Sequence, residues 1–132
     1  MRLRWLLYVP LVLLAGCAVT GGESPLSLFQ TKGEIALQAG IKNYEEGDYR
    51  DALIDLQSAL GSGLNKSAEI RAHKYSAFVY CVTGKEKLCR DEFKKVLELD
   101  PAFNLDAAEA GHPMWGPVFR GVKAADKNRK SF

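Results

Sequence analysis

The sequence has very few of the residues on which most catalytic and metal sites depend. It contains only two histidines, His73 and His112, and three cysteines in 132 residues. It has no Gly-x-Ser-x-Gly, His-Glu-x-x-His or phosphate-cradling glycine motif. His112 lies between Gly111 and Pro113 and is expected to be a turn residue whose ring forms a local hydrogen bond. We therefore predict that the protein is not an enzyme and has no metal, cofactor or small-molecule substrate; a hydrolase that uses His112 is the enzyme alternative.

The sequence also lacks a strong excess of charge. It holds 18 Lys and Arg residues against 16 Asp and Glu residues, which does not indicate nucleic-acid binding. The basic residues Lys127, Arg129 and Lys130 are interpreted as a helix C-terminus followed by a solvated tail. Contact of this segment with a phospholipid or a partner remains an alternative.

No apolar run is long enough to span a bilayer, but a short one follows Arg2 and Arg4. It extends from Trp5 to Leu14 and has the order of a secretory signal. The residues that follow it, Leu14 to Cys17, resemble the lipobox of bacterial lipoproteins, in which the cysteine is diacylated and becomes the first residue. The alternative is a buried or chance cysteine beside an ordinary cleavage site.

The lipobox resemblance divides the chain into three parts: a signal peptide (1–16), a lipidated flexible tether (17–30) and a helical domain (31–130). The acyl chains would hold the domain on a membrane, because each buried methylene contributes about 0.8 kcal/mol. By resemblance to lipoprotein sorting rules, Ala18 in place of aspartate favours the outer membrane, facing the periplasm. The tether is polar except for Leu26, Leu28 and Phe29, which are expected to dock onto the first helix.

Four helices are predicted from residue 31 onward by apolar periodicity and by their end signals. Thr31 and Glu34 have the spacing of a capping box, Gly47 ends the first helix, and Asp48 caps the second. A third helix, from about 67 to 83, is apolar around its circumference and should be central. Asp100 and Pro101 end the fourth helix, whose predicted inward residues are Leu88, Cys89, Phe93, Val96 and Leu97.

The two predicted helix pairs are copies of each other at a constant offset of 37 residues. This offset places Gly47 on Gly84, Ala52 on Cys89, Leu56 on Phe93 and Ala59 on Val96. Both copies resemble the tetratricopeptide (TPR) pattern. A fifth helix with Trp115, Val118, Phe119 and Val122 on one face is expected to cover the second hairpin, over Phe103 and Leu105. The predicted fold is all-α, with two TPR-like antiparallel hairpins and a C-terminal capping helix; an unrelated helical bundle is the alternative.

Two cysteines lie symmetrically about the predicted second turn. Cys81 is four residues before Lys85 and Cys89 is four residues after it, so they are at similar heights on facing helices. Oxidising conditions outside the cytoplasm favour a disulfide between them. Two buried free thiols are the alternative.

The first helix of each TPR hairpin lines the concave side, which predicts a partner-binding surface. Its residues would be Glu34, Leu37, Ile41 and Tyr44 from the first copy and Arg71, Lys74 and Phe78 from the second. A few apolar anchors among charges are typical of peptide or helix recognition. The alternative is that these residues are core, covered by the helix around Trp115.

A longer stretch resembles a specific family. It is AHKYSAFVYCVTGKEKLCRDEFKKVLELDPAFNLDAAEAGHPMWGPVF, from Ala72 to Phe119, and it is similar to the core of the TssQ-type TPR lipoproteins encoded with bacterial type VI secretion systems. The resemblance implies an accessory scaffold of that cell-envelope assembly, with protein partners and no catalytic residues. A secretin pilotin or an outer-membrane assembly lipoprotein is the alternative.

Overall fold

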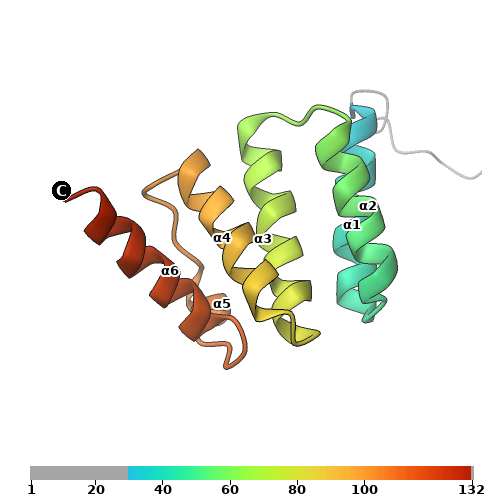
Figure 1. Ribbon diagram of the computed structural model, residues 1–132. Coiled ribbons are helices and arrows are strands. Elements are labelled where there is room, and N and C mark those ends of the chain that lie inside the picture. The colour runs from blue at the N-terminus through green and yellow to red at the C-terminus, as the bar shows by residue number, and fades with distance from the viewer. Residues whose placement is uncertain (1–29, 132) are drawn as a thin grey trace, which may run out of the picture.

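The computed structural model describes residues 30–131 as a row of antiparallel helices (Figure 1). They are α1 (Lys32–Glu46), α2 (Tyr49–Gly61), α3 (Lys66–Val82), α4 (Glu86–Leu99), α5 (Ala107–Ala110) and α6 (Gly116–Arg129). This range contains no strand, and the predicted all-α fold of helix hairpins is confirmed. No helix in the same range is both long enough and apolar enough to cross a membrane. The predicted signal peptide, Cys17 and most of the tether lie outside the described residues.

The first hairpin begins and ends where the local sequence signals place it. The Thr31 hydroxyl accepts a hydrogen bond from the Glu34 backbone N–H, and the Glu34 carboxylate accepts one from the Thr31 N–H at 2.8 Å. Gly47 ends α1 with φ of +85°, a conformation that favours glycine. Asp48 does precede α2, but its side chain makes no capping hydrogen bond, so the predicted cap is wrong in its chemistry.

The internal repeat is visible in the packing of the second hairpin. Gly84 repeats the left-handed turn of Gly47, with φ of +77°. The three apolar pairs related by the 37-residue offset are all fully buried: Ala52 and Cys89, Leu56 and Phe93, Ala59 and Val96. Equivalent residues of the two copies therefore perform the same packing role.

Helix α3 is the central element, as its apolar circumference predicts. It packs against α1, α2 and α4, and Tyr75 contacts both core clusters of the domain, the one under α1–α2 and the one under α4–α6. The fourth helix differs from the prediction at one position: Leu88 is 42% exposed. The inward stripe of α4 therefore consists of Cys89, Phe93, Val96 and Leu97.

The C-terminal segment covers the second hairpin. Helix α6 packs on α4, and the ring centroids of Phe119 and Phe93 lie 5.2 Å apart. Pro117 lies in the first turn of α6, where its missing N–H costs no helical hydrogen bond. Phe103 packs beside Phe119, and Leu105 is buried, as expected. Within the connection, the additional short helix α5 starts from a capping box between Asp106 and Glu109.

Candidate functional site

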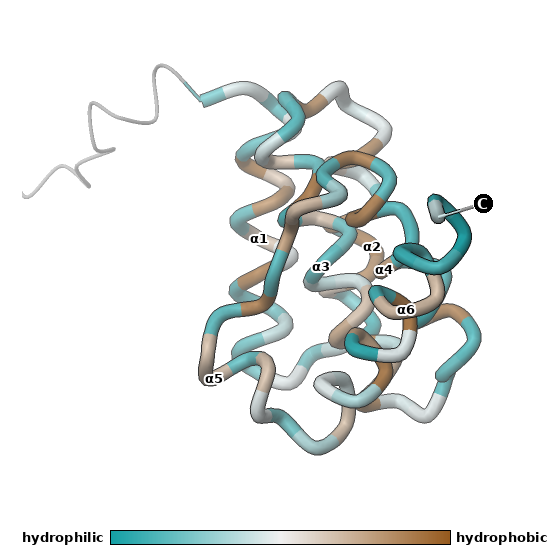
Figure 2. Tube along the Cα trace, turned by 90° about the vertical axis from the view of Figure 1, so that its left-hand side faces the viewer, coloured by the Kyte–Doolittle hydropathy of each residue, from teal (hydrophilic) through white to brown (hydrophobic). Residues whose placement is uncertain are grey.

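The side of the domain formed by α1 and α3 carries the predicted partner-binding residues, and the structure divides it into two halves. After α4 the chain runs to α5, which lies on this side of the domain (Figure 2) and is linked to α3 by the pair Lys74 and Glu109. The C-terminal half of α3 is covered by residues of the α5 segment, whereas the N-terminal halves of α1 and α3 border open hollows. We call these the covered half and the open half.

Aromatic packing closes the covered half. Phe78 is only 2% exposed, and its ring stacks on Trp115 with 4.2 Å between centroids. Ile41 is 7% exposed and packs in the cluster under α1 and α2. The prediction that Phe78 and Ile41 contact a partner is therefore wrong in this form of the molecule: both are core residues, and Phe78 is buried by the C-terminal segment.

Lys74 is also engaged inside the molecule. Its Nζ lies 2.5 Å from Glu109 Oε1, and the two side chains are 15% and 19% exposed. The same Nζ lies 4.9 Å from the centroid of the Tyr75 ring, where a cation interacts favourably with the ring face. Lys74 was predicted as an exposed partner contact, but it links α3 to α5.

The segment after α5 is held by local contacts of Trp115. Its indole Nε1 donates to the Glu109 carbonyl oxygen at 2.8 Å, and its ring stacks on His112 with an interplanar angle of 2°. The His112 Nδ1 atom accepts a hydrogen bond from the Met114 backbone N–H at 3.2 Å. The expected role of His112, a turn residue with a local hydrogen bond, is confirmed.

Tyr44 lies at the edge of the covered half. Its ring contacts the Tyr75 ring at 5.3 Å between centroids. Burial, with smaller contributions from Tyr49, Tyr75 and Glu109, raises the pKa of Tyr44 to about 12. Its hydroxyl is therefore protonated and neutral at any physiological pH.

The open half is centred on Arg71. Two hollows of about 490 and 570 Å³ lie on either side of it, and Ser67 and Arg71 line both. Arg71 is exposed and forms no ion pair with any residue from 30 to 131. The other lining residues mix apolar and polar groups: Gln30, Glu34, Leu37, Gln38, Asn65, Lys66, Ala68, Ile70, Asp100 and Phe103. Of the predicted partner-binding residues, Glu34 and Arg71 are brought together here, whereas Leu37 is 1% exposed and belongs to the core under α1 and α2.

The cysteines of the second hairpin form a disulfide. The Sγ atoms of Cys81 and Cys89 lie 2.06 Å apart, with 5.2 Å between the Cα atoms, so the bridge joins α3 to α4 across the Gly84 turn. Cys17, the predicted lipidation site, lies outside the described residues.

Besides the disulfide, the side chains of His73 and Glu92 form a polar link between α3 and α4. Their side chains are 2.6 Å apart at the closest atoms, and Lys95 also donates to the Glu92 carboxylate. Burial of Glu92 opposes its ionisation, but the hydrogen bonds from His73 and Lys95 outweigh burial and hold the pKa of the carboxyl below its usual value. Because this pair is satisfied between two packed helices, it has a structural role.

Residues 30–131 contain no group of three or more His, Cys, Asp or Glu side chains that converge as a metal site requires. Comparison of the chain with models of protein families, with curated proteins and with solved structures finds no match.

The sequence interpretation missed the role of α5 in closing half of the α1–α3 side. A local signal was present, because Asp106 and Glu109 have the spacing of a capping box. Nothing in the sequence pattern, however, pairs Glu109 with Lys74, which is 35 residues away.

Proposed function

We propose that this protein is a lipid-anchored periplasmic interaction module, an accessory scaffold of a type VI secretion assembly held on the outer membrane. The observation that carries the proposal is the lipobox-like stretch Leu14 to Cys17, followed within a short tether by a domain of TPR-like hairpins. The stretch from Ala72 to Phe119 resembles TssQ-type lipoproteins, and this resemblance is the reason for proposing a type VI secretion system.

The open half offers a surface suited to protein capture. Arg71 is exposed between two hollows, one of which contains the partly exposed apolar residues Ile70 and Phe103. A segment with a carboxylate and one or two apolar side chains would match this surface, because an arginine fork binds a carboxylate through two hydrogen bonds. Anchored through two acyl chains, the module would keep such a partner near the membrane.

The anchor is tested by metabolic labelling with a fatty-acid analogue. The wild-type chain should be labelled, and Cys17→Ser should abolish the label and leave an uncleaved precursor. Equal labelling of the two proteins would refute the anchor without bearing on the helical domain.

The surface is tested by co-purification of the full-length protein from cells that express the secretion system. Arg71→Glu should greatly reduce recovery of secretion-system components, whereas Lys87→Glu, a matched reversal at an 88% exposed side chain on α4, should not. Both variants should unfold within about 0.5 kcal/mol of wild type, since exposed substitutions rarely do more.

The identity of the recovered proteins decides the system. Secretion-system components that depend on Arg71 support the proposal. Recovery of a secretin or of barrel-assembly proteins would favour the alternative of a pilotin or an outer-membrane assembly lipoprotein. Normal recovery with Arg71→Glu would exclude the open half as the binding surface.

A further inference from the structure

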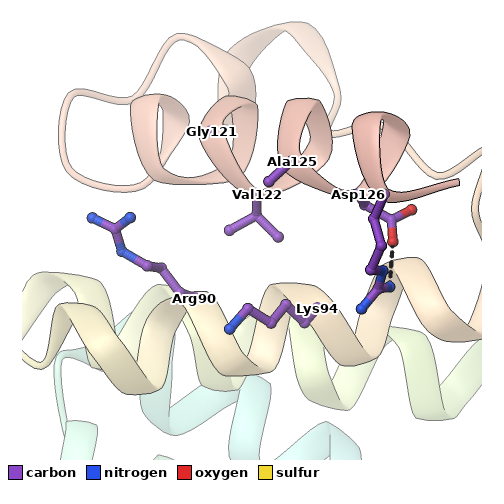
Figure 3. Close-up of a pocket in the computed structure, with 7 residues that line it drawn as sticks. Arg90, Lys94, Gly121, Val122, Ala125 and Asp126 are labelled. Carbon is purple, nitrogen blue, oxygen red and sulfur yellow. Dashed lines mark hydrogen bonds and ion pairs between the residues drawn. The ribbon is translucent and has the colours of Figure 1, made fainter. Parts of the chain in front are cut away.

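A groove of about 280 Å³ lies between α4 and α6 (Figure 3). Arg90 and Lys94 reach into it from α4, and Val122 projects into it from α6. Ala125, Asp126 and Arg129 of α6 complete the lining. We call this the α4–α6 groove. It combines a small apolar surface with three cationic side chains, so it suits a ligand that is both apolar and acidic.

Each of the three cations of this groove pairs with a carboxylate, but only one carboxylate lies in the lining itself. Asp126 is its one acidic residue, and its carboxylate is shared by Arg129 at 2.7 Å and Lys130 at 2.6 Å. Arg90 and Lys94 pair with carboxylates of their own helix, and the cationic side chains are 52% and 57% exposed. Exposed pairs of this kind contribute little, so the two cations can turn to another acceptor at small cost.

Charge is also distributed unevenly along the described chain. Residues 116–130 contain five Lys or Arg residues and one acidic residue, whereas residues 30–115 contain 14 acidic and 11 basic residues. The positive end of the domain is therefore the end formed by α6. A partner that docks there by charge complementarity must be acidic.

Comparison of the two repeats shows that the cations of α4 are particular to this groove. By the 37-residue offset, Arg90 and Lys94 are equivalent to Leu53 and Gln57, which line the corresponding groove beside α3 in the first hairpin. That groove also contains Lys85, at the start of the next hairpin's second helix.

We infer that the α4–α6 groove binds an acidic amphipathic helix of a protein partner. Apolar side chains of that helix contact Val122 and Ala125, and its carboxylates pair with Arg90, Lys94 and Arg129. Two of these three cations are arginines, which bind carboxylates through two parallel hydrogen bonds. Docking of a helix into such a groove is a common mode of recognition. This surface is separate from the open half, and the inference does not depend on the proposed secretion system.

The test uses full-length protein purified in detergent and a fluorescent synthetic peptide. The peptide is a helix of about 18 residues with leucines on one face and glutamates flanking them. The control peptide has every glutamate replaced by glutamine. Fluorescence anisotropy should show saturable binding of the acidic peptide and at least tenfold weaker binding of the control.

Two sets of variants assign the binding to the groove. Arg90→Glu combined with Arg129→Glu should weaken binding at least tenfold, and Ala125→Phe, which fills the groove without changing charge, should weaken it as well. The matched control is Lys42→Glu combined with Lys87→Glu, whose side chains are 74% and 88% exposed and outside the groove. It should leave binding within about twofold, and circular dichroism should show that every variant is folded.

Three results would overturn the inference: no binding of the acidic peptide, equal binding of the two peptides, or equal loss in the groove and control variants. A different result would be tighter binding to phosphatidylglycerol micelles than to phosphatidylcholine micelles, with a requirement for Arg90 and Arg129 and without binding of the peptide. That result would assign the groove to a lipid surface.

Discussion

Replacing Trp115 with alanine should release the C-terminal segment from the hairpins. The substitution removes a side chain that is 6% exposed, its stack on Phe78 and the hydrogen bond from Nε1 to the Glu109 carbonyl. Truncation of a buried tryptophan to alanine costs about 3 to 5 kcal/mol, since the cavity left behind is only partly refilled. For a domain of about 100 residues, this corresponds to a fall in Tm of roughly 12 °C or more.

Urea denaturation followed by far-ultraviolet circular dichroism measures this effect, because the substitution also removes the one tryptophan of the helical domain, which a fluorescence assay would use. Trp115→Phe is the matched control: it keeps an aromatic ring on Phe78 but loses the N–H donor, so a smaller cost of about 1 to 2 kcal/mol is expected. If Trp115→Ala costs less than about 1 kcal/mol, Trp115 does not anchor the segment, and the covered half of the α1–α3 side would not be core.

Three further predictions follow from the packing. Alkylation of the unreduced periplasmic protein, measured by mass spectrometry, should modify neither Cys81 nor Cys89. Replacing both with alanine should lower the free energy of unfolding by about 2 to 3 kcal/mol. Full alkylation without reductant would exclude the bridge. Gly40→Ala should destabilise the domain, because the new Cβ would lie 2.8 Å from Leu56 Cγ. Gly121→Ala has no atom within 4 Å of its Cβ and should stabilise the helix by up to about 1 kcal/mol. Equal changes in Tm for the two variants would contradict this. In the folded protein the pKa of Glu92 lies below its usual 4.5, so the unfolded chain binds more protons, and the stability that Glu92 contributes is lost as the pH falls below 4.5. Urea titrations at a series of pH values should show that Glu92→Gln loses less stability on acidification than the wild type does. Parallel plots of stability against pH for the two proteins would refute the effect.

The sequence predicts the hairpins well, because their determinants are local or periodic. Thr31 and Glu34 specify the start of α1 through hydrogen bonds three residues apart, and Gly47 and Gly84 supply the two left-handed turns. The 37-residue offset identifies equivalent core positions such as Leu56 and Phe93, because a repeated hairpin buries the same face each time.

The errors concern contacts between residues that are distant in the sequence. The sequence pattern predicts Lys74 to be a solvent-exposed cation, but in the structure it pairs with Glu109 of α5. It predicts Phe78 to be an exposed partner contact, but Trp115 covers its ring. Leu88 follows the apolar rhythm of α4, but it is one position away from the buried stripe that begins at Cys89. Periodicity defines a face only to within about one residue, and it does not show what covers that face.

The central claim, that the open half captures a component of the secretion system, is tested most directly by site-specific photo-crosslinking in cells. A photoreactive amino acid at Ser67, which lines both hollows beside Arg71, should form a crosslink to a type VI secretion component in the full-length anchored protein. The same photoreactive amino acid placed at Ser58, an exposed position on α2, should form no such crosslink. The absence of a crosslink at Ser67, or the same adduct from both positions, would contradict the claim.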